Sequence, residues 1–237
     1  MGRKSAKIAA KKGAQDKLRS QVYTKMLFEV TRAVKTGGDD PKTNFLLRVA
    51  LGKCKKNNVP KDNIDRAIKK GMGGDGDGYS DVYYEGYGCG GVGVFVETST
   101  NNVARTVANI RYCFSRNGGT LENSGTLRFL FTRKAIFEIK KESLDEDEFM
   151  LEMIDAGAEE IEPEDDLFVV TAEKEDFGSI QKKLEEMGIV PEDASLERIP
   201  SAYKKLSGEK FEQFQRMIEA LEADEDVIRV FHNLEYD

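Results

Sequence analysis

Lysine and arginine side chains are concentrated in the first third of the chain. Residues 1–72 hold 19 of them against six Asp and Glu, a net charge of +13. The remaining residues hold 17 against 37, a net charge of −20, so the formal charge of −7 conceals a basic segment. Ammonium and guanidinium groups at this density bind phosphates and release the counterions around them. The pattern therefore predicts a polyanionic partner, and nucleic acid is the usual one.

The expected nucleic-acid contacts fall on a segment without acidic residues and on the polar faces of two expected helices. They are Arg3, Lys4, Lys7, Lys11 and Lys12 on the segment, Lys25, Arg32 and Lys35 on the first helix, and Lys61, Arg66, Lys69 and Lys70 on the third. Lysines with few aromatic neighbours suit contact with phosphates rather than base stacking. A solvated lysine-rich surface, or docking of this region onto the chain's own acidic domains, is the alternative.

A second basic spot is expected at Arg105 and Arg116, beside Asn101 and Asn102 at the start of a later helix. We expect it to face the same way as the glycine-rich hairpin at residues 88–91. Ordinary surface is the alternative for this spot.

Catalytic signals are weak. His232 is the single histidine, so neither a Ser–His–Asp triad nor a two-histidine metal site is available, although lysine- or carboxylate-based chemistry stays open. No Walker A or dinucleotide fingerprint is present, and the glycines of residues 87–91 join two expected strands instead of preceding a helix. We therefore expect a non-enzymatic protein with no catalytic residues, metal or cofactor and no small-molecule substrate.

Three helices are expected to position the basic side chains. Apolar residues recur at helical spacing over residues 15–36, and Pro41 and Pro60 each suit the start of a further helix. Five glycines within residues 71–78 then interrupt all periodicity and indicate a linker. The sequence predicts a basic helical domain over residues 1–74.

The rest of the chain alternates between strand and helix signals. Strands are expected at 82–87, 92–97 and 126–131 around a helix at 102–116, and a helix at 208–222 and a strand at 227–233 end the chain. Between them, residues 134–201 have the βαββαβ order of a ferredoxin-like domain. The predicted fold is α+β and multi-domain: a three-helix domain, then a discontinuous α/β domain of residues 79–133 plus 202–237, into which the ferredoxin-like domain is inserted.

The composition indicates a cytoplasmic protein. No apolar run approaches the roughly 20 residues of a membrane helix, so no membrane partner is expected. Three widely spaced cysteines without a C-x-x-C pair suit a reducing compartment. The basic start leaves a mitochondrial presequence as the alternative.

Several motifs, in order along the chain, resemble the YebC/PmpR family. They are GRKSAKI at residues 2–8, VPKDNIDRAIKK at 59–70, YEGYG at 84–88, NVARTV at 102–107, GG at 118–119 and SGTLRFLF at 124–131. That family includes the mitochondrial translational activator of cytochrome c oxidase, and the resemblance covers essentially the whole chain. This chain departs from the family pattern at three positions: the family usually has Trp in place of Ser5, Asn in place of Lys7 and Pro in place of Cys89.

The resemblance implies a three-domain, cytoplasmic, non-enzymatic regulator of gene expression. The bacterial family is commonly described as DNA-binding transcriptional regulators. Other members are placed on the ribosome, where they ease synthesis of proline-rich stretches. DNA and ribosomal or transfer RNA are thus both open as partners, as is the ribosome itself, and a pure protein-interaction module is a further alternative. Without the family tryptophan, the segment around Ser5 is expected to act more purely through charge.

Overall fold

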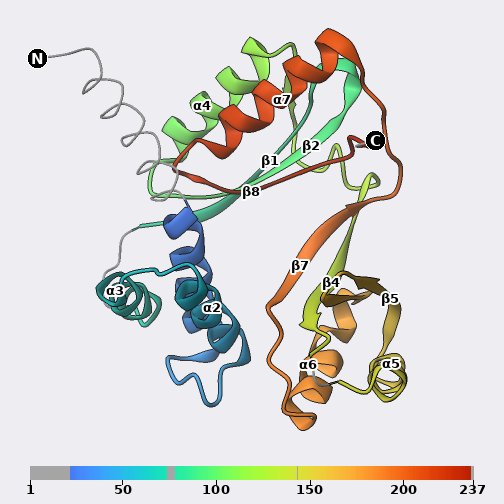
Figure 1. Cartoon of the computed structure of the whole chain (residues 1–237). Helices are drawn as coiled ribbons and strands as arrows, with labels where there is room; N and C mark the ends of the chain where they lie inside the picture. Colours follow the sequence, from blue (N-terminus) through green and yellow to red (C-terminus); the bar gives the residue numbers. More distant parts are fainter. Residues whose placement is uncertain (1–21, 74–77, 143, 236–237) are drawn as a thin grey trace, which may run out of the picture. The chain divides into compact units, whose positions relative to one another are not determined.

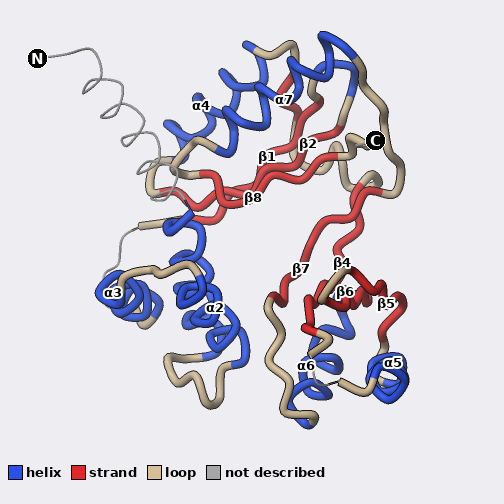
Figure 2. Tube along the Cα trace, in the orientation of Figure 1, coloured by secondary structure: helices blue, strands red, loops and turns tan. Residues whose placement is uncertain are grey.

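The computed structural model describes residues 22–73, 78–142 and 144–235 of the chain. The chain divides into two compact units, residues 1–75 and 76–237. Helices make up the described part of the first unit, whereas the second combines two antiparallel sheets with helices (Figures 1 and 2). The predicted α+β class is confirmed.

Three helices form the described part of the first unit, residues 22–73. Residues 22–37 are helical, followed by α2 (Phe45–Lys56) and α3 (Lys61–Gly71). Their core contains Val30, Leu47 and Cys54, all fully buried. This burial of apolar surface is what holds three short helices together, because isolated helices of this length are marginal in water.

Buried Asn44 fixes the turn between the first two of these helices. Its Oδ1 accepts a hydrogen bond from the Leu47 backbone N–H at 3.1 Å, which caps α2. Its Nδ2 donates to the carbonyls of Ala33 at 2.8 Å and Gly38 at 2.7 Å, at the end of the preceding helix. One side chain thus satisfies backbone groups at both helix ends.

The first sheet of the second unit has the order β3-β1-β2-β8, with every pairing antiparallel. Its strands are β1 (Ser80–Tyr87), β2 (Gly93–Thr100), β3 (Thr120–Glu122) and β8 (Val227–His232). Helices α4 (Val103–Arg116) and α7 (Gly208–Glu222) cover one face of the sheet. Phe114 and Phe214 of these helices pack into a core with the strand residues Val94 and Val96.

The second sheet has the order β5-β6-β4-β7. Its elements in chain order are β4 (Phe131–Lys140), α5 (Glu146–Asp155), β5 (Ala158–Glu164), β6 (Leu167–Glu173), α6 (Phe177–Glu186) and β7 (Asp193–Pro200). This strand order is that of the split βαβ motif, so the ferredoxin-like prediction is confirmed. The chain leaves the first sheet after β3 and returns to it at α7 and β8.

Two sequence predictions about this unit are wrong. Residues 126–131 are not a strand: residues 124–130 form consecutive turns, and β4 begins at Phe131. For Arg105, the expected placement beside the hairpin at residues 88–91 is wrong, because the start of α4 and the hairpin lie at opposite ends of β2; the Arg116 end of α4 is the one near the hairpin, since Gly119 lies against Gly88. The hairpin precedes Gly93 and α4 follows Thr100.

Candidate nucleic-acid interface

Basic side chains of the first helix share its polar face. Lys25, Arg32 and Lys35 are spaced seven and three residues apart, which places them on one side of a helix. Arg32 and Lys35 are exposed and Lys25 is half-buried, while Ala33 and Val34 are buried on the core side. The structure thus brings these three predicted residues together.

Helix α3 carries the second predicted group. Lys61, Arg66 and Lys69 are exposed and Lys70 is half-buried, whereas Ala67 faces the core. The Arg66 guanidinium donates to the Asp62 carbonyl at 3.1 Å and to the Asn63 side chain, which holds it along its own helix. Its remaining N–H groups point to solvent and can meet a phosphate oxygen.

The end of α2 adds basic residues that the sequence analysis did not single out. Lys53, Lys55 and Lys56 lie in its last turn, where the carbonyl ends of the helix favour positive charge. Lys53 pairs with Glu29 at 2.9 Å, and Lys55 and Lys56 are exposed. Basic residues in the last turn of an expected helix were the signal that could have found them.

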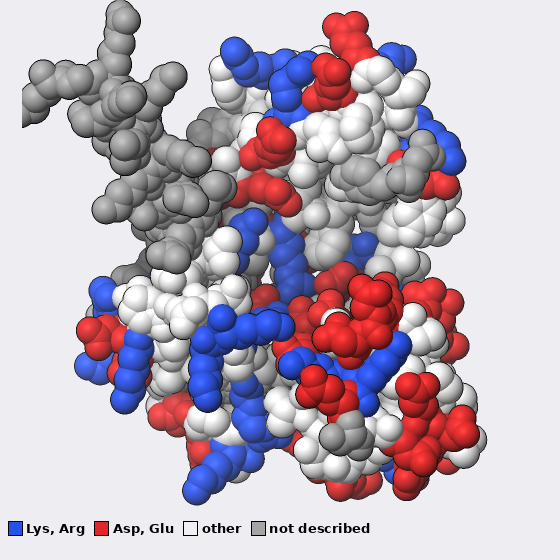
Figure 3. Space-filling view, viewed as in Figure 1, with Lys and Arg blue, Asp and Glu red and all other residues white. Residues whose placement is uncertain are grey.

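The described part of the helical unit is strongly positive. Residues 22–73 contain 12 Lys and Arg against five Asp and Glu, a net charge of +7. Lys and Arg side chains lie over α2 and α3 in the space-filling view (Figure 3). Such a surface attracts phosphates, which position a nucleic acid without carrying direct sequence information. The predicted contacts Arg3, Lys4, Lys7, Lys11 and Lys12 lie outside the described residues.

Acidic residues gather instead on the second sheet and its helices. Residues 134–201 contain seven Lys and Arg against 22 Asp and Glu, a net charge of −15. Residues 79–133 and 202–237 together carry only −3. The negative charge of the second unit is therefore concentrated in the ferredoxin-like part, which would repel a polyanion.

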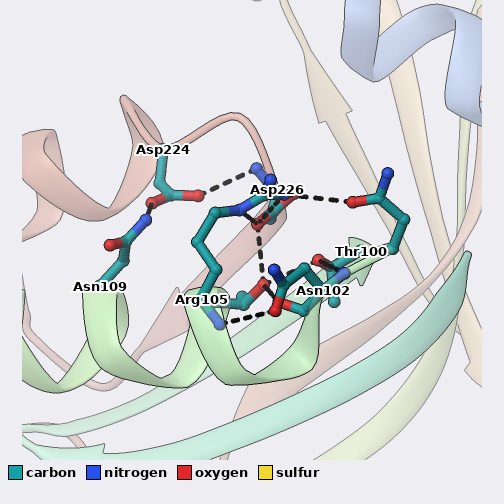
Figure 4. A network of polar contacts seen from close by, with 8 residues as sticks. Thr100, Asn102, Arg105, Asn109, Asp224 and Asp226 are labelled. Atoms are coloured by element: carbon teal, nitrogen blue, oxygen red, sulfur yellow. Dashed lines mark hydrogen bonds and ion pairs between the residues drawn. The ribbon is translucent and has the colours of Figure 1, made fainter.

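Arg105 is tied into a hydrogen-bond network (Figure 4). Its guanidinium donates to both oxygens of buried Asp226, at 2.8 and 2.9 Å, and Thr106 Oγ1 donates to Asp226 Oδ2 at 2.7 Å. The hydrogen bond and charge of Asp226 raise the pKa of Arg105. The pair joins the start of α4 to the turn before β8, which indicates a structural role for Arg105.

The network continues on both sides of this pair. Asn102 caps α4 by accepting from the Arg105 backbone N–H at 3.0 Å, and Thr106 Oγ1 lies 2.8 Å from Thr100 Oγ1. Asn109 donates to Asp224 at 2.9 Å (Figure 4). The NVARTV motif thus supplies the cap, the arginine and the threonine that hold the two segments together.

Arg116 lies at the other end of α4. It is exposed, donates to the Tyr112 hydroxyl at 3.0 Å and lies over the Tyr112 ring. Eleven helical residues separate it from Arg105, or about 16 Å at 1.5 Å per residue. The two arginines therefore do not form one basic spot; both are exposed, but the Arg105 guanidinium is paired with Asp226.

The described residues contain no cluster of three or more His, Cys, Asp and Glu placed to hold a metal ion. His232 is packed edge-on against Phe214, and its Nδ1 accepts from the Leu234 N–H at 3.3 Å. Burial lowers the pKa of His232. In residues 22–73, 78–142 and 144–235, no helix is long and apolar enough to cross a bilayer.

Two family models together match almost the whole chain. Residues 3–74 match the TACO1/YebC protein N-terminal domain, and residues 79–234 match the TACO1/YebC second and third domain. These matched ranges meet at the glycine-rich linker.

Curated relatives from several bacteria are similar along nearly their full length. A "probable transcriptional regulatory protein" of Parabacteroides distasonis is 45% identical over 92% of this chain and 90% of its own. A protein of the same description from Chlorobaculum tepidum is 42% identical over 98% of this chain and 93% of its own. The crystal structure of a conserved hypothetical protein from Aquifex aeolicus superposes with a TM-score of 0.73 at 34% identity, covering 92% of this chain and 90% of that one. The chain belongs to the TACO1/YebC family.

Proposed function

We propose that this protein is a cytoplasmic, non-enzymatic regulator of gene expression that binds DNA through the phosphate backbone. The observation that supports it is the positive surface of the helical unit, with Arg32, Lys35 and Lys69 exposed on the sides of their helices away from the core. The names of the relatives, which describe probable transcriptional regulators, agree with this proposal.

The chemistry of this surface favours binding with little dependence on base sequence. Lysine ammonium groups act as point charges toward phosphates, and phosphates carry no direct sequence information. The acidic ferredoxin-like domain disfavours approach of the polyanion on its own side, and its charge suits a basic protein partner.

Translation control is the second candidate. The same lysines can neutralise the phosphates of ribosomal or transfer RNA, since both backbones carry the same charged group. In this version the protein acts on the ribosome and eases synthesis of proline-rich stretches. Comparison of duplex DNA, transfer RNA and ribosomes as ligands separates the two candidates.

Charge reversal in the full-length protein tests the proposed surface. Arg32→Glu, Lys35→Glu and Lys69→Glu combined should weaken binding to every sequence and reduce the slope of log K against log salt by about three. The matched control reverses three exposed lysines of the second unit, Lys174, Lys182 and Lys210. Equal losses in both triple variants would show that total charge, rather than this surface, determines binding.

A further inference from the structure

The SGTLRFLF motif forms a turn held by a buried carboxylate. Glu85 of β1 accepts hydrogen bonds from the backbone N–H groups of Gly125 at 2.8 Å and Leu127 at 2.7 Å. Gly125 has φ +90°, which a side chain would strain. Leu127 is buried against Phe95 and Phe131, so the base of the turn is part of a small apolar core.

The far side of the turn is also anchored. The Ser201 N–H donates to the Leu130 carbonyl at 2.8 Å, and the Ser201 hydroxyl donates to the Phe129 carbonyl at 3.2 Å. The Arg128 N–H closes the turn onto the Gly125 carbonyl at 3.3 Å. The backbone around Phe129 is therefore fixed on both sides, and its direction does not depend on the Phe129 side chain.

At the tip of this turn, Phe129 projects into solvent. It is 81% exposed, more than any other large hydrophobic residue of the described chain. The Arg128 guanidinium lies 4.4 Å from the centroid of its ring, and no described carboxylate pairs with that guanidinium. An aromatic ring on a rigid support, with an arginine alongside, can stack a flat ligand at small entropic cost because it is already oriented.

Nucleobases fit this arrangement. Every base has a π face that stacks on an aromatic ring, and an adjacent arginine can neutralise the phosphate of the same nucleotide. A base inside a duplex is stacked on both faces by its neighbours, so the ligand must be an unstacked nucleotide. The polar turn residues Asn123, Ser124 and Thr126 provide no apolar rim of the kind that surrounds a protein hot spot.

We propose that Phe129 is a stacking platform for an unpaired base in a single-stranded segment of nucleic acid, with Arg128 at the neighbouring phosphate. This inference rests on the proposed nucleic-acid-binding function and adds to it a ligand class and a second contact point outside the helical unit. It assigns to the SGTLRFLF motif a role that backbone binding by lysines does not supply.

The chain contains no tryptophan, so Phe129→Trp introduces a single indole at the proposed contact. Its fluorescence should be quenched by a 12-nucleotide oligo(U) or oligo(dT) strand and unaffected by a blunt 12-base-pair duplex. Phe129→Ala should weaken binding of the single strands about five- to 150-fold, the effect of losing one stacked base. Binding of the duplex should remain at the wild-type level. Leu151→Ala, at an exposed apolar residue of α5, is the matched control and should change neither affinity.

The outcomes separate this inference from the proposed function. An unquenched indole in Phe129→Trp, or unchanged single-strand affinity in Phe129→Ala, overturns the inference while salt-dependent duplex binding still supports the function. Failure of the wild-type protein to bind any nucleic acid at low salt overturns both. Because the Phe129 ring is exposed, these variants should keep the wild-type melting temperature, which shows that a lost affinity is not a lost fold.

Discussion

Replacing Glu85 with glutamine tests the anchoring of the turn at residues 123–130. The substitution keeps the shape of the side chain and changes one acceptor oxygen into an amide donor. In the native structure both oxygens accept from backbone N–H groups, those of Gly125 and Leu127. Glutamine can satisfy one of them and must point its own N–H₂ group at the other.

The expected cost follows from these two bonds. A hydrogen bond to a charged group contributes about 1.5–3 kcal/mol, and the variant loses one such bond in a site where Glu85 is only 6% exposed. We therefore expect Glu85→Gln to lower the free energy of opening of this turn by about 1.5–3 kcal/mol. In native-state amide exchange, protection at Gly125 and Leu127 should fall about ten- to 150-fold.

Glu122 provides a matched control, because it lies directly opposite Glu85 in the pairing of β1 with β3 and is exposed. Glu122→Gln should leave exchange at Gly125 and Leu127 unchanged. Wild-type protection in Glu85→Gln, or equal losses in both variants, would refute the assignment of Glu85 as the anchor.

Three further predictions concern separate parts of the chain. Arg105→Ala should lower the melting temperature, because buried Asp226 loses its cationic partner, and should leave nucleic-acid affinity unchanged. Arg116→Ala should leave the melting temperature unchanged. A lower melting temperature in Arg116→Ala than in Arg105→Ala would contradict the roles assigned to the two arginines. Burial, with a smaller contribution from Glu29, raises the pKa of the Cys54 thiol from 9.0 to about 11, so its thiolate fraction at pH 8 falls about a hundredfold. A short iodoacetamide pulse read by mass spectrometry should therefore leave Cys54 unmodified in the native protein and modified in urea, whereas rapid native labelling would argue against burial. Because the pKa of His232 is lowered in the folded protein, the unfolded chain binds the proton more readily, so the contribution of His232 to stability is fully present above about pH 6.5 and is lost as the pH falls below it. In urea unfolding, the free energy of unfolding should therefore decrease less between pH 7.5 and pH 5.5 in His232→Gln than in the wild type. An equal decrease in both proteins would assign the pH dependence to other groups.

The elements with strong apolar periodicity could be predicted from the sequence. Phe214, Met217 and Leu221 recur at helical spacing, and α7 spans residues 208–222 as expected. The βαββαβ order of the second sheet was also predictable, because β6 and the second half of β4 alternate in burial and α5 and α6 each bury apolar residues. In these elements, local pattern and tertiary packing agree.

The errors arose where contacts distant in sequence decide the local structure. The run Thr126–Phe131 has strand-like composition, yet Glu85, some 40 residues earlier, takes up the N–H groups of Gly125 and Leu127 that a strand would have used for pairing. Likewise, the basic spot predicted at Arg105 does not account for its partner Asp226, which lies 121 residues away. No local pattern reports either contact.

The helical unit is proposed to hold nucleic acid through its phosphates. This proposal is tested most directly by the affinity of the full-length protein for duplex DNA and transfer RNA between 50 and 200 mM salt. We predict that log K falls linearly with log salt, with a slope of magnitude about 3 or more, as expected when several lysines and arginines each displace a counterion. Absence of binding at the lowest salt, or an affinity that does not change across the range, would contradict the account.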